Sequence, residues 1–304
     1  MTGKLLAASD ATEAPRQDPM LIAHLSDLHV PATGEPVPGA ADVNAALHKA
    51  FAALQALSPR PDLVIVSGDV ADAGRPRAYG RAAEMLRVLK RPIVAVPGNH
   101  DDPAGFACFM HEIGGESRIP APELCSVRDF AALRVIGLSS KIPLTSAGGL
   151  DDAQLDWLDA TLTEAPARPT LLVVHHPPFR CGVGYMDRIR LVDGAVRLEC
   201  IVAAHPQVLA VLCGHHHRAM ETQFGGRPCW VAPSLAYAVS LDLRPGGEGG
   251  FSREPASYRL LHYDGRRLVS HLAYVEGTGA ARPFRRHDPA EADVPAIALA
   301  SSDA

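Results

Sequence analysis

Apolar and polar residues alternate in blocks over the first part of the chain, and the blocks predict alternating strands and helices. Short apolar runs at residues 21–25, 62–66 and 92–96 predict strands, of which 62–66 is a run typical of a strand covered on both faces. Between them, apolar residues at helical spacing predict helices at 43–57 and 76–90. Strands and helices that alternate at this spacing predict a parallel sheet with right-handed crossovers.

The pattern continues to residue 213 and then changes to β-hairpins. Helices are expected at 103–112, 151–163 and 194–204, a hairpin at 125–130 with 133–138, and strands at 170–174 and 208–213. Two later hairpins are expected, at 219–224 with 228–231 and at 258–263 with 267–274. Residues 179–192 read as a long irregular loop that covers a substrate, and 245–255 as a mobile Gly-rich segment. We expect disordered tails at 1–19 and beyond about residue 278.

Composition narrows the class of protein. With 304 residues, 47% of them hydrophobic and 21% charged, the chain reads as an ordinary soluble protein, and no apolar run is long enough for a membrane helix. The net charge of −5 gives no basic excess, so nucleic acid is not an expected partner. Residues 1–20 lack the pattern of a signal peptide, which makes the cytoplasm the expected location. The six cysteines include no CxxC pair, which argues against a structural zinc finger.

Five predicted strands are followed by side chains able to bind metal. The segments are Asp27-Leu28-His29, Gly68-Asp69, Gly98-Asn99-His100-Asp101, His175-His176-Pro177 and Gly214-His215-His216-His217. Taken singly, each is as readily a surface turn, a tight turn or a strand end blocked by proline. Together they indicate one site, because open α/β sheets bind ligands at the carboxyl ends of their strands.

The candidate donors of this site are two carboxylates, one amide and four imidazoles, namely Asp27, Asp69, Asn99, His29, His175, His215 and His217. Nitrogen and oxygen donors without a thiolate favour Zn, Fe or Mn over soft metals and over Ca or Mg. Seven donors are too many for one transition ion and suit two, if one carboxylate bridges them. Two ions about 3.5–4 Å apart can hold the attacking and leaving oxygens of an in-line phosphoryl displacement. The donor set therefore predicts phosphoester hydrolysis.

These segments, in this order, resemble the calcineurin-like metallophosphoesterases, and the resemblance covers about residues 20–233. It implies an α/β fold, a four-layer α/β/β/α sandwich with a βαβαβ core and a C-terminal β-rich extension or cap. The domain would span residues 20–278, with 236–278 as a cap or oligomerisation extension and 279–304 as a tail.

The resemblance also assigns roles to the donors. On the family's pattern one ion would be held by Asp27, His29, Asp69 and His217. The other would be held by Asp69, Asn99, His175 and His215, with Asp69 bridging and a metal-bridging hydroxide attacking phosphorus.

Neighbouring residues take supporting roles in the same resemblance. His100 would lie near the leaving-group or a nonbridging phosphate oxygen as an acid or stabiliser, and Asp101 would orient it. The other candidates for contact with ligands or substrate are His176, His216, Asp72 and Met186. For Asp72, a helix cap or a turn is an equal alternative.

Within the family, His175-His176-Pro177-Pro178 and the loop with Met186-Asp187 are similar to the bacterial cyclic-nucleotide phosphodiesterases and glycerophosphodiesterases. That branch implies small phosphodiester substrates, Mn, Fe, Zn or Co as the two ions, and a homodimer or larger homo-oligomer. The alternatives are a phosphomonoesterase or nuclease of the same fold, or a non-catalytic metal-binding scaffold.

Overall fold

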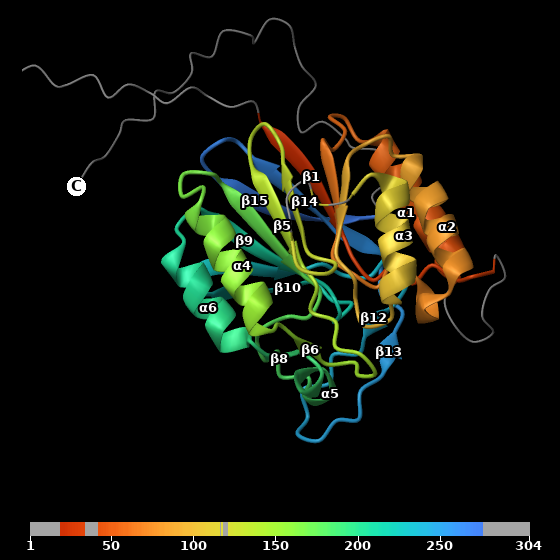
Figure 1. The fold of residues 1–304 in the computed structure, drawn as a ribbon. Coiled ribbons are helices and arrows are strands. Elements are labelled where there is room, and N and C mark those ends of the chain that lie inside the picture. Colours follow the sequence, from red (N-terminus) through yellow and green to blue (C-terminus); the bar gives the residue numbers. More distant parts are fainter. Residues whose placement is uncertain (1–18, 34–41, 116, 118–120, 276–304) are drawn as a thin grey trace, which may run out of the picture.

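Two β-sheets pack face to face, and helices cover the outer face of each (Figure 1). The computed structural model describes residues 19–33, 42–115, 117 and 121–275. Within them the four layers follow the order helices, sheet, sheet, helices, which confirms the predicted fold class. Apart from Pro19, both predicted tails lie outside the described residues. No helix in the described part of the chain is long and apolar enough to cross a membrane.

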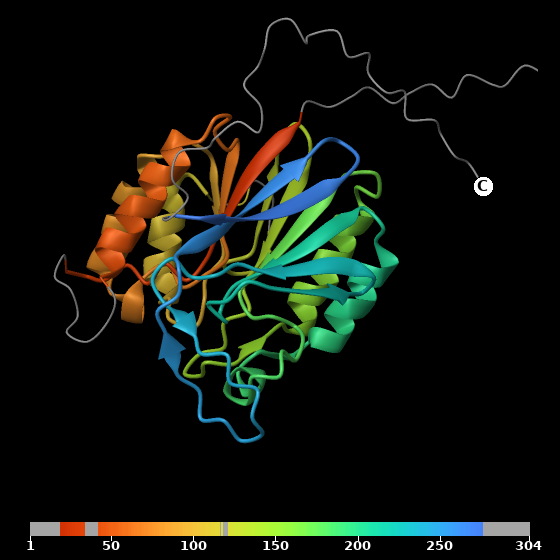
Figure 2. The ribbon, with the colours of Figure 1, turned by 180° about the vertical axis from the view of Figure 1, so that it is seen from behind.

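The first sheet has the strand order β15-β14-β1-β2-β3. Its parallel strands are β1 (Met20–Leu25), β2 (Leu63–Val66) and β3 (Ile93–Ala95), as predicted. The covering helices are α1 (Val43–Ala56), α2 (Pro76–Arg87) and α3 (Pro103–Ile113). The C-terminal hairpin, β14 (Ser257–Tyr263) and β15 (Leu268–Tyr274), pairs antiparallel with β1, and Figure 2 shows it beside that strand. Residues 257–274 therefore complete the first sheet.

The second sheet has the strand order β10-β11-β9-β7-β5-β4. Its strands are β4 (Ser126–Asp129), β5 (Arg134–Leu138), β7 (Thr170–Val174), β9 (Val208–Cys213), β10 (Met220–Phe224) and β11 (Arg227–Val231). The helices α4 (Asp152–Thr163) and α6 (Ala195–Ala204) cover its outer face. Asp151 caps α4 and forms a capping box with Gln154, which fixes where that helix begins.

Alternate residues of the central strands enter different hydrophobic cores. On β7, Leu171 and Val173 pack between the two sheets, whereas Leu172 and Val174 pack under α4 and α6. Side chains alternate across a strand, so an uninterrupted apolar run fills both cores. This explains why the buried strands read as continuous apolar segments.

Two segments that were expected to be irregular contain regular structure. Residues 179–192 include the short helix α5 (Gly184–Arg188) and the beginning of β8 (Leu191–Asp193), which pairs with β6 (Gly148–Gly149). In the Gly-rich segment, β13 (Phe251–Ser252) pairs with β12 (Ala238–Val239). These pieces are too short for their apolar period to be visible in the sequence, so the prediction of an irregular loop at 179–192 was wrong. A 3₁₀ turn, η1 (Asp72–Gly74), follows the loop after β2.

A buried arginine ties the C-terminal hairpin to the second sheet. Arg259 on β14 is 1% exposed. Its guanidinium donates to the carbonyl oxygens of Val231 at 2.9 Å and Met220 at 3.0 Å, and to Glu221 and Ser270 at 2.9 Å. Arg259 thus joins β14 to main-chain carbonyls of β10 and β11.

We predict that Arg259→Met lowers the free energy of unfolding by about 2–4 kcal/mol, because it removes the four hydrogen bonds of a buried guanidinium. Urea denaturation followed by circular dichroism measures the loss. Arg197→Met is the matched control, since Arg197 on α6 bonds the exposed Asp152 and Asp156 and its loss should barely move the midpoint. An unchanged midpoint for Arg259→Met would contradict the role assigned to this side chain.

Candidate metal centre

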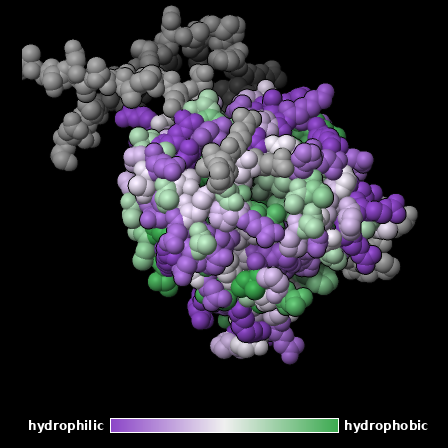
Figure 3. Space-filling model, in the orientation of Figure 1, coloured by the Kyte–Doolittle hydropathy of each residue, from purple (hydrophilic) through white to green (hydrophobic). Residues whose placement is uncertain are grey.

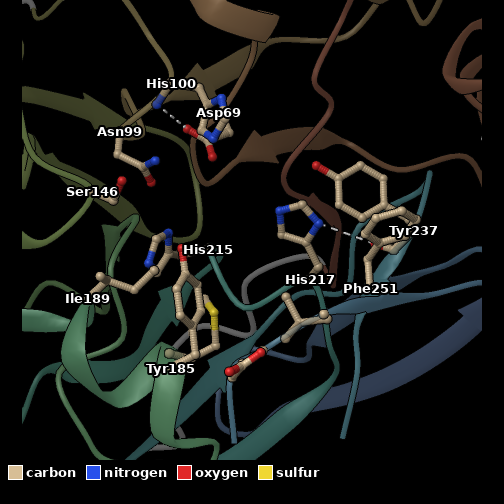
Figure 4. Close-up of a pocket in the computed structure, with 15 residues that line it drawn as sticks. Asp69, Asn99, His100, Ser146, Tyr185, Ile189, His215, His217, Tyr237 and Phe251 are labelled. Carbon is tan, nitrogen blue, oxygen red and sulfur yellow. Dashed lines mark hydrogen bonds between the residues drawn. The ribbon is translucent and has the colours of Figure 1, made fainter. Parts of the chain in front are cut away.

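The predicted donors meet where the parallel strands of both sheets end. Asp27 and Asp69 follow β1 and β2, and Asn99 lies in the loop after β3. His175 and His215 follow β7 and β9 of the second sheet. The close-up in Figure 4 shows Asp69, Asn99, His215 and His217 around one cavity. The structure thus brings together side chains that are up to 190 positions apart, 27 to 217, in the chain.

Most of these donors occupy a backbone conformation that non-glycine residues rarely adopt. The φ angles are positive at Asp27 (52°), His29 (44°), Asp69 (50°), His215 (67°) and His217 (53°). Such angles cost free energy and persist where the surrounding structure holds them, most often at functional sites. The five strained positions therefore mark the loops that aim side chains into the centre.

A first group of donors contains Asp27, His29, Asp69 and His217, all of them buried. The two imidazole Nε2 atoms of His29 and His217 lie 3.2 Å apart. His217 Nε2 is 3.3 Å from Asp27 Oδ1, and His29 Nε2 is 3.6 Å from Asp69 Oδ2. Two ring nitrogens and two carboxylates therefore converge on one point.

A second group lies on the other side of Asp69. His175 Nε2 is 3.4 Å from Asp69 Oδ2 and 3.2 Å from Asn99 Oδ1. His215 Nε2 is buried and has no hydrogen-bond partner among the described residues. The same oxygen, Oδ2 of Asp69, therefore faces both groups, while its Oδ1 accepts a hydrogen bond from the His100 amide at 2.9 Å.

This arrangement fits two cations. Buried imidazole nitrogens normally find a hydrogen-bond partner, so the unpartnered His215 Nε2 points to a positive ligand in the second group, and the close approach of His29 and His217 points to one in the first. Two of the four donor histidines have their second ring nitrogen occupied elsewhere. His175 Nδ1 donates to the Ser67 carbonyl at 2.7 Å and His217 Nδ1 to the Tyr237 carbonyl at 3.2 Å, which leaves each Nε2 lone pair for the centre.

The charges of the two groups are strongly interdependent. Burial opposes ionisation of Asp69, but the neighbouring His175 and His29 hold the pKa of this carboxyl well below its ordinary value. Burial lowers the pKa of His175, but the negative charge of Asp69 outweighs it and raises that pKa to about 9. A divalent ion takes the place of such a proton when it binds, so the same carboxylate favours metal.

Three glycines beside the donors are needed for close approach. A Cβ on Gly98 would lie 2.1 Å from Asp69 Oδ1, and one on Gly68 would lie 2.2 Å from His175 Nδ1. A Cβ on Gly214 would lie 1.9 Å from Ser26 Oγ. Each distance is far below van der Waals contact, so a larger residue at any of these three positions would displace the neighbouring side chain.

His100 lies at the edge of the centre, next to a carboxylate other than the predicted one. Its Nδ1 is 3.7 Å from Asp72 Oδ1, and its ring meets the His29 ring edge-on at 4.7 Å. Asp101 instead accepts bonds from the main chain: its oxygens receive the amides of Val70, Ala71 and Gly98 at 2.8–3.1 Å. The predicted orientation of His100 by Asp101 is therefore corrected to Asp72, because the Asp101 carboxylate is turned back into the loops.

The two remaining histidines differ in their surroundings. His176 Nδ1 lies 2.7 Å from Ser140 Oγ, its Nε2 lies 3.2 Å from the Ser146 carbonyl, and its ring lies 4.5 Å from that of His215. It therefore packs behind a donor with both nitrogens occupied. His216 is 1% exposed, and neither of its ring nitrogens has a hydrogen-bond partner among the described residues.

A cavity of about 440 Å³ opens from the two groups toward solvent. Asp69, Asn99, His100, His215 and His217 form its inner end. Its other lining residues are Ser146, Tyr185, Met186, Ile189, Tyr237, Val239, Glu248, Gly249, Gly250 and Phe251. Met186, predicted as a substrate candidate, is thus placed on the wall, and the volume suits a small molecule.

Comparison with known proteins supplies the family. The model of the calcineurin-like phosphoesterases matches residues 20–219. The chain belongs to this family. It is 34% identical over 268 residues to the glycerophosphodiester phosphodiesterase GpdQ of Enterobacter lignolyticus. The aligned region covers 85% of this chain and 93% of that protein. The chain is 32% identical over 244 residues to a cAMP/cGMP dual specificity phosphodiesterase of Mycobacterium tuberculosis; this alignment covers 79% of this chain and 74% of that protein.

Solved structures agree on the fold of this calcineurin-like phosphoesterase. A dimetal phosphatase from Danio rerio superposes with a TM-score of 0.58, covering 84% of this chain and 99% of that one at 17% identity. At 17% identity, this structural similarity supports the fold and nothing further.

Sequence reasoning missed Tyr237, which holds two donors of this phosphoesterase in place. Its ring stacks on His29 with centroids 5.8 Å apart and tilts against His217 at 4.6 Å. Its carbonyl also receives the His217 Nδ1 proton. No local pattern around Tyr237 marks it, because its position depends on how the chain returns after β11.

We predict that Gly98→Ala abolishes metal binding while the domain stays folded, because the added methyl group would displace the Asp69 carboxylate. Metal content after reconstitution and dialysis measures the loss, and circular dichroism checks the fold. Gly80→Ala on α2 is the matched control, since no atom lies within 4 Å of the added methyl. Equal metal content in the two variants would show that metal binding by Asp69 does not depend on the close contact with Gly98.

Proposed function

We propose that this calcineurin-like phosphoesterase hydrolyses small phosphodiesters of the cyclic-nucleotide or glycerophosphodiester type, using two divalent transition ions from among Mn, Fe, Zn and Co. The observation that carries the proposal is the single Asp69 oxygen, which faces His29 at 3.6 Å and His175 at 3.4 Å. The relatives named as diesterases support the substrate class.

The proposed ligands follow the two groups of donors. Asp27, His29, Asp69 and His217 would hold one ion; Asp69, Asn99, His175 and His215 would hold the other. When bound, two such ions supply Lewis acidity at phosphorus and lower the pKa of a water molecule that serves as nucleophile. The buried loops keep these side chains fixed and exclude bulk water from behind the phosphate.

His100 is proposed as the residue that assists the leaving alcohol. Its side chain lines the cavity and is 43% exposed, so it can reach a bound diester. The Asp72 carboxylate, whose Oδ1 lies 3.7 Å from Nδ1, raises the pKa of His100, partly offset by burial. With Nδ1 directed at Asp72, Nε2 is free to donate a proton to the departing oxygen.

The rival functions are less consistent with the cavity. Its lining contains no Lys or Arg, the side chains that a nuclease uses to hold neighbouring phosphates. A non-catalytic scaffold would have no need of seven converging donors, five of which have positive φ angles. The cytoplasmic location, the homodimer or larger homo-oligomer, and the cap role of residues 236–278 stay predictions.

We expect Asp69→Ala to lose metal and activity together, because it removes a ligand of both ions. Hydrolysis of bis(p-nitrophenyl) phosphate should fall by a factor of roughly 10³ or more, with bound metal reduced in parallel. The wild-type protein stripped by a chelator should be equally inactive and should recover with Mn, Fe, Co or Zn. Hydrolysis by the metal-free protein would refute the proposal, and a faster reaction with p-nitrophenyl phosphate would favour the monoesterase.

We expect His100→Gln to affect poor leaving groups far more than good ones. The turnover number for an alkyl diester should fall by roughly 10²–10³, and that for bis(p-nitrophenyl) phosphate by less than about tenfold, since nitrophenolate departs without a proton. Asp72→Asn should show the same selectivity more weakly. Equal losses on both substrates would exclude proton donation by His100.

A further inference from the structure

One peptide group lies between the metal donors and a lysine from the other sheet. The His100 amide donates to Asp69 Oδ1 at 2.9 Å, and the Asn99 carbonyl of the same peptide accepts from Lys141 Nζ at 2.7 Å. Lys141 follows β5 of the second sheet, whereas Asp69 and Asn99 follow strands of the first. The peptide between Asn99 and His100 therefore connects loops of both sheets beside the metal centre.

The charges along this connection stand in a favourable order. The carbonyl and the amide of a trans peptide point in opposite directions, so the ammonium group meets the negative end of the peptide dipole and the carboxylate meets the positive end. Hydrogen bonds in such a row polarise one another, and bonds to charged groups are stronger than bonds between neutral ones. The ammonium group of Lys141 therefore strengthens the hold of this peptide on Asp69.

Asn99 is the donor that most needs such support. The other six candidate donors are 0–7% exposed, whereas Asn99 is half-buried. Its amide oxygen is also uncharged, so it attracts a cation less strongly than a carboxylate does. Hydrophilic side chains cover much of the face shown in Figure 3, and water at such a surface competes for main-chain groups that are only half-buried. A charged donor holds the Asn99 carbonyl better against this competition than a neutral one would.

The segment that carries Lys141 is packed firmly from behind. Ser140 is 0% exposed, and its Oγ lies 2.7 Å from His176 Nδ1. A Cβ on Gly148, the β-bridge partner of Lys141, would lie 2.4 Å from the His176 ring. The half-buried lysine side chain thus extends from a fixed base toward Asn99. Lys141 does not line the cavity, so it acts on the centre through the peptide and not through the substrate.

We propose that Lys141 is a positioning residue for the second ion, the one to be held by Asp69, Asn99, His175 and His215. This rests on the proposed function, since the ligand set is the one proposed there. Through a single peptide, Lys141 fixes the main chain of one ligand and an oxygen of another. The amide oxygen of Asn99 already lies 3.2 Å from His175 Nε2, where an ion can join them.

Lost position and lost charge predict opposite effects on metal binding. Removing a positive charge near a metal centre would, by charge alone, tighten the binding of a cation. Removing a group that orients two ligands would loosen it, and changes to the partners of metal ligands typically cost about 10–100-fold in affinity. Weaker binding of the second ion in a variant without the ammonium group would therefore reflect lost position.

The experiment titrates Mn²⁺ into the metal-free protein and follows binding by isothermal titration calorimetry. For Lys141→Met we expect the Kd of the second ion to rise at least about tenfold, while that of the first ion stays within about threefold. Lys141→Arg keeps a charged donor and should recover part of the loss. Lys90→Met is the matched control, because it removes the same charge from an exposed residue that does not line the cavity.

Two further measurements separate positioning from general support of the fold. Circular dichroism of the metal-free Lys141→Met protein should give the wild-type thermal midpoint. The electron paramagnetic resonance signal of a coupled Mn pair should appear in this variant only at higher Mn²⁺ than in the wild type. With both ions bound at saturating Mn²⁺, the turnover number for bis(p-nitrophenyl) phosphate should return to within about threefold of the wild-type value.

Each adverse outcome bears on one claim. Unchanged or tighter binding of the second ion in Lys141→Met would overturn the positioning role, and the proposed function would stand if the wild type hydrolyses bis(p-nitrophenyl) phosphate. Equal weakening of both ions, or loss of the metal-free fold, would also overturn it, because Lys141 would then support the structure in general. Binding of a single ion by the wild type, without hydrolysis of any diester, would refute the proposed function itself.

Discussion

The position of one carboxylate oxygen determines how the metal centre is organised. Asp69 Oδ2 faces His29 and His175, which belong to loops of different sheets. Its other oxygen is held by the His100 amide, and Gly98 leaves room for it. Behind it, the buried Asp101 fastens the loops after β2 and β3 to each other through main-chain amides. Burial and the charge of Asp69 raise the pKa of Asp101 to about 6. Cations at the centre would relieve this repulsion between buried carboxyl groups.

Much of this arrangement could be predicted because it is encoded locally. Apolar runs identify the buried strands, and the polar residues directly after them must gather at one edge of each sheet. The same reasoning predicts that the seven candidate donors gather at these edges. It failed where a side chain's direction matters: Asp101 follows His100 in sequence, yet its carboxylate points into the loops, and Asp72 is the acid beside that imidazole.

Other features depend on distant parts of the chain and left no local signal. The hairpin β14–β15 was expected, but hydrophobic alternation does not say which strand it will join. Tyr237 and Phe251 reach the cavity through β12 and β13, strands of two residues each, where no period can be read. The parts of the site that carry out chemistry therefore follow regular strands. Tyr237 and Phe251, which line the cavity farther from the donors, lie on short, irregular returns.

The pairing of β1 has a consequence for how the protein is made. The strand that carries Asp27 toward the centre lies between β2 and β14, so one of its edges is filled by residues near the other end of the described chain. While the ribosome is still adding residues 257–263, that edge presents unpaired main-chain groups, the kind of surface that recruits strands from other molecules. The nascent βαβαβ core must therefore remain protected from association until nearly the whole domain has been synthesised.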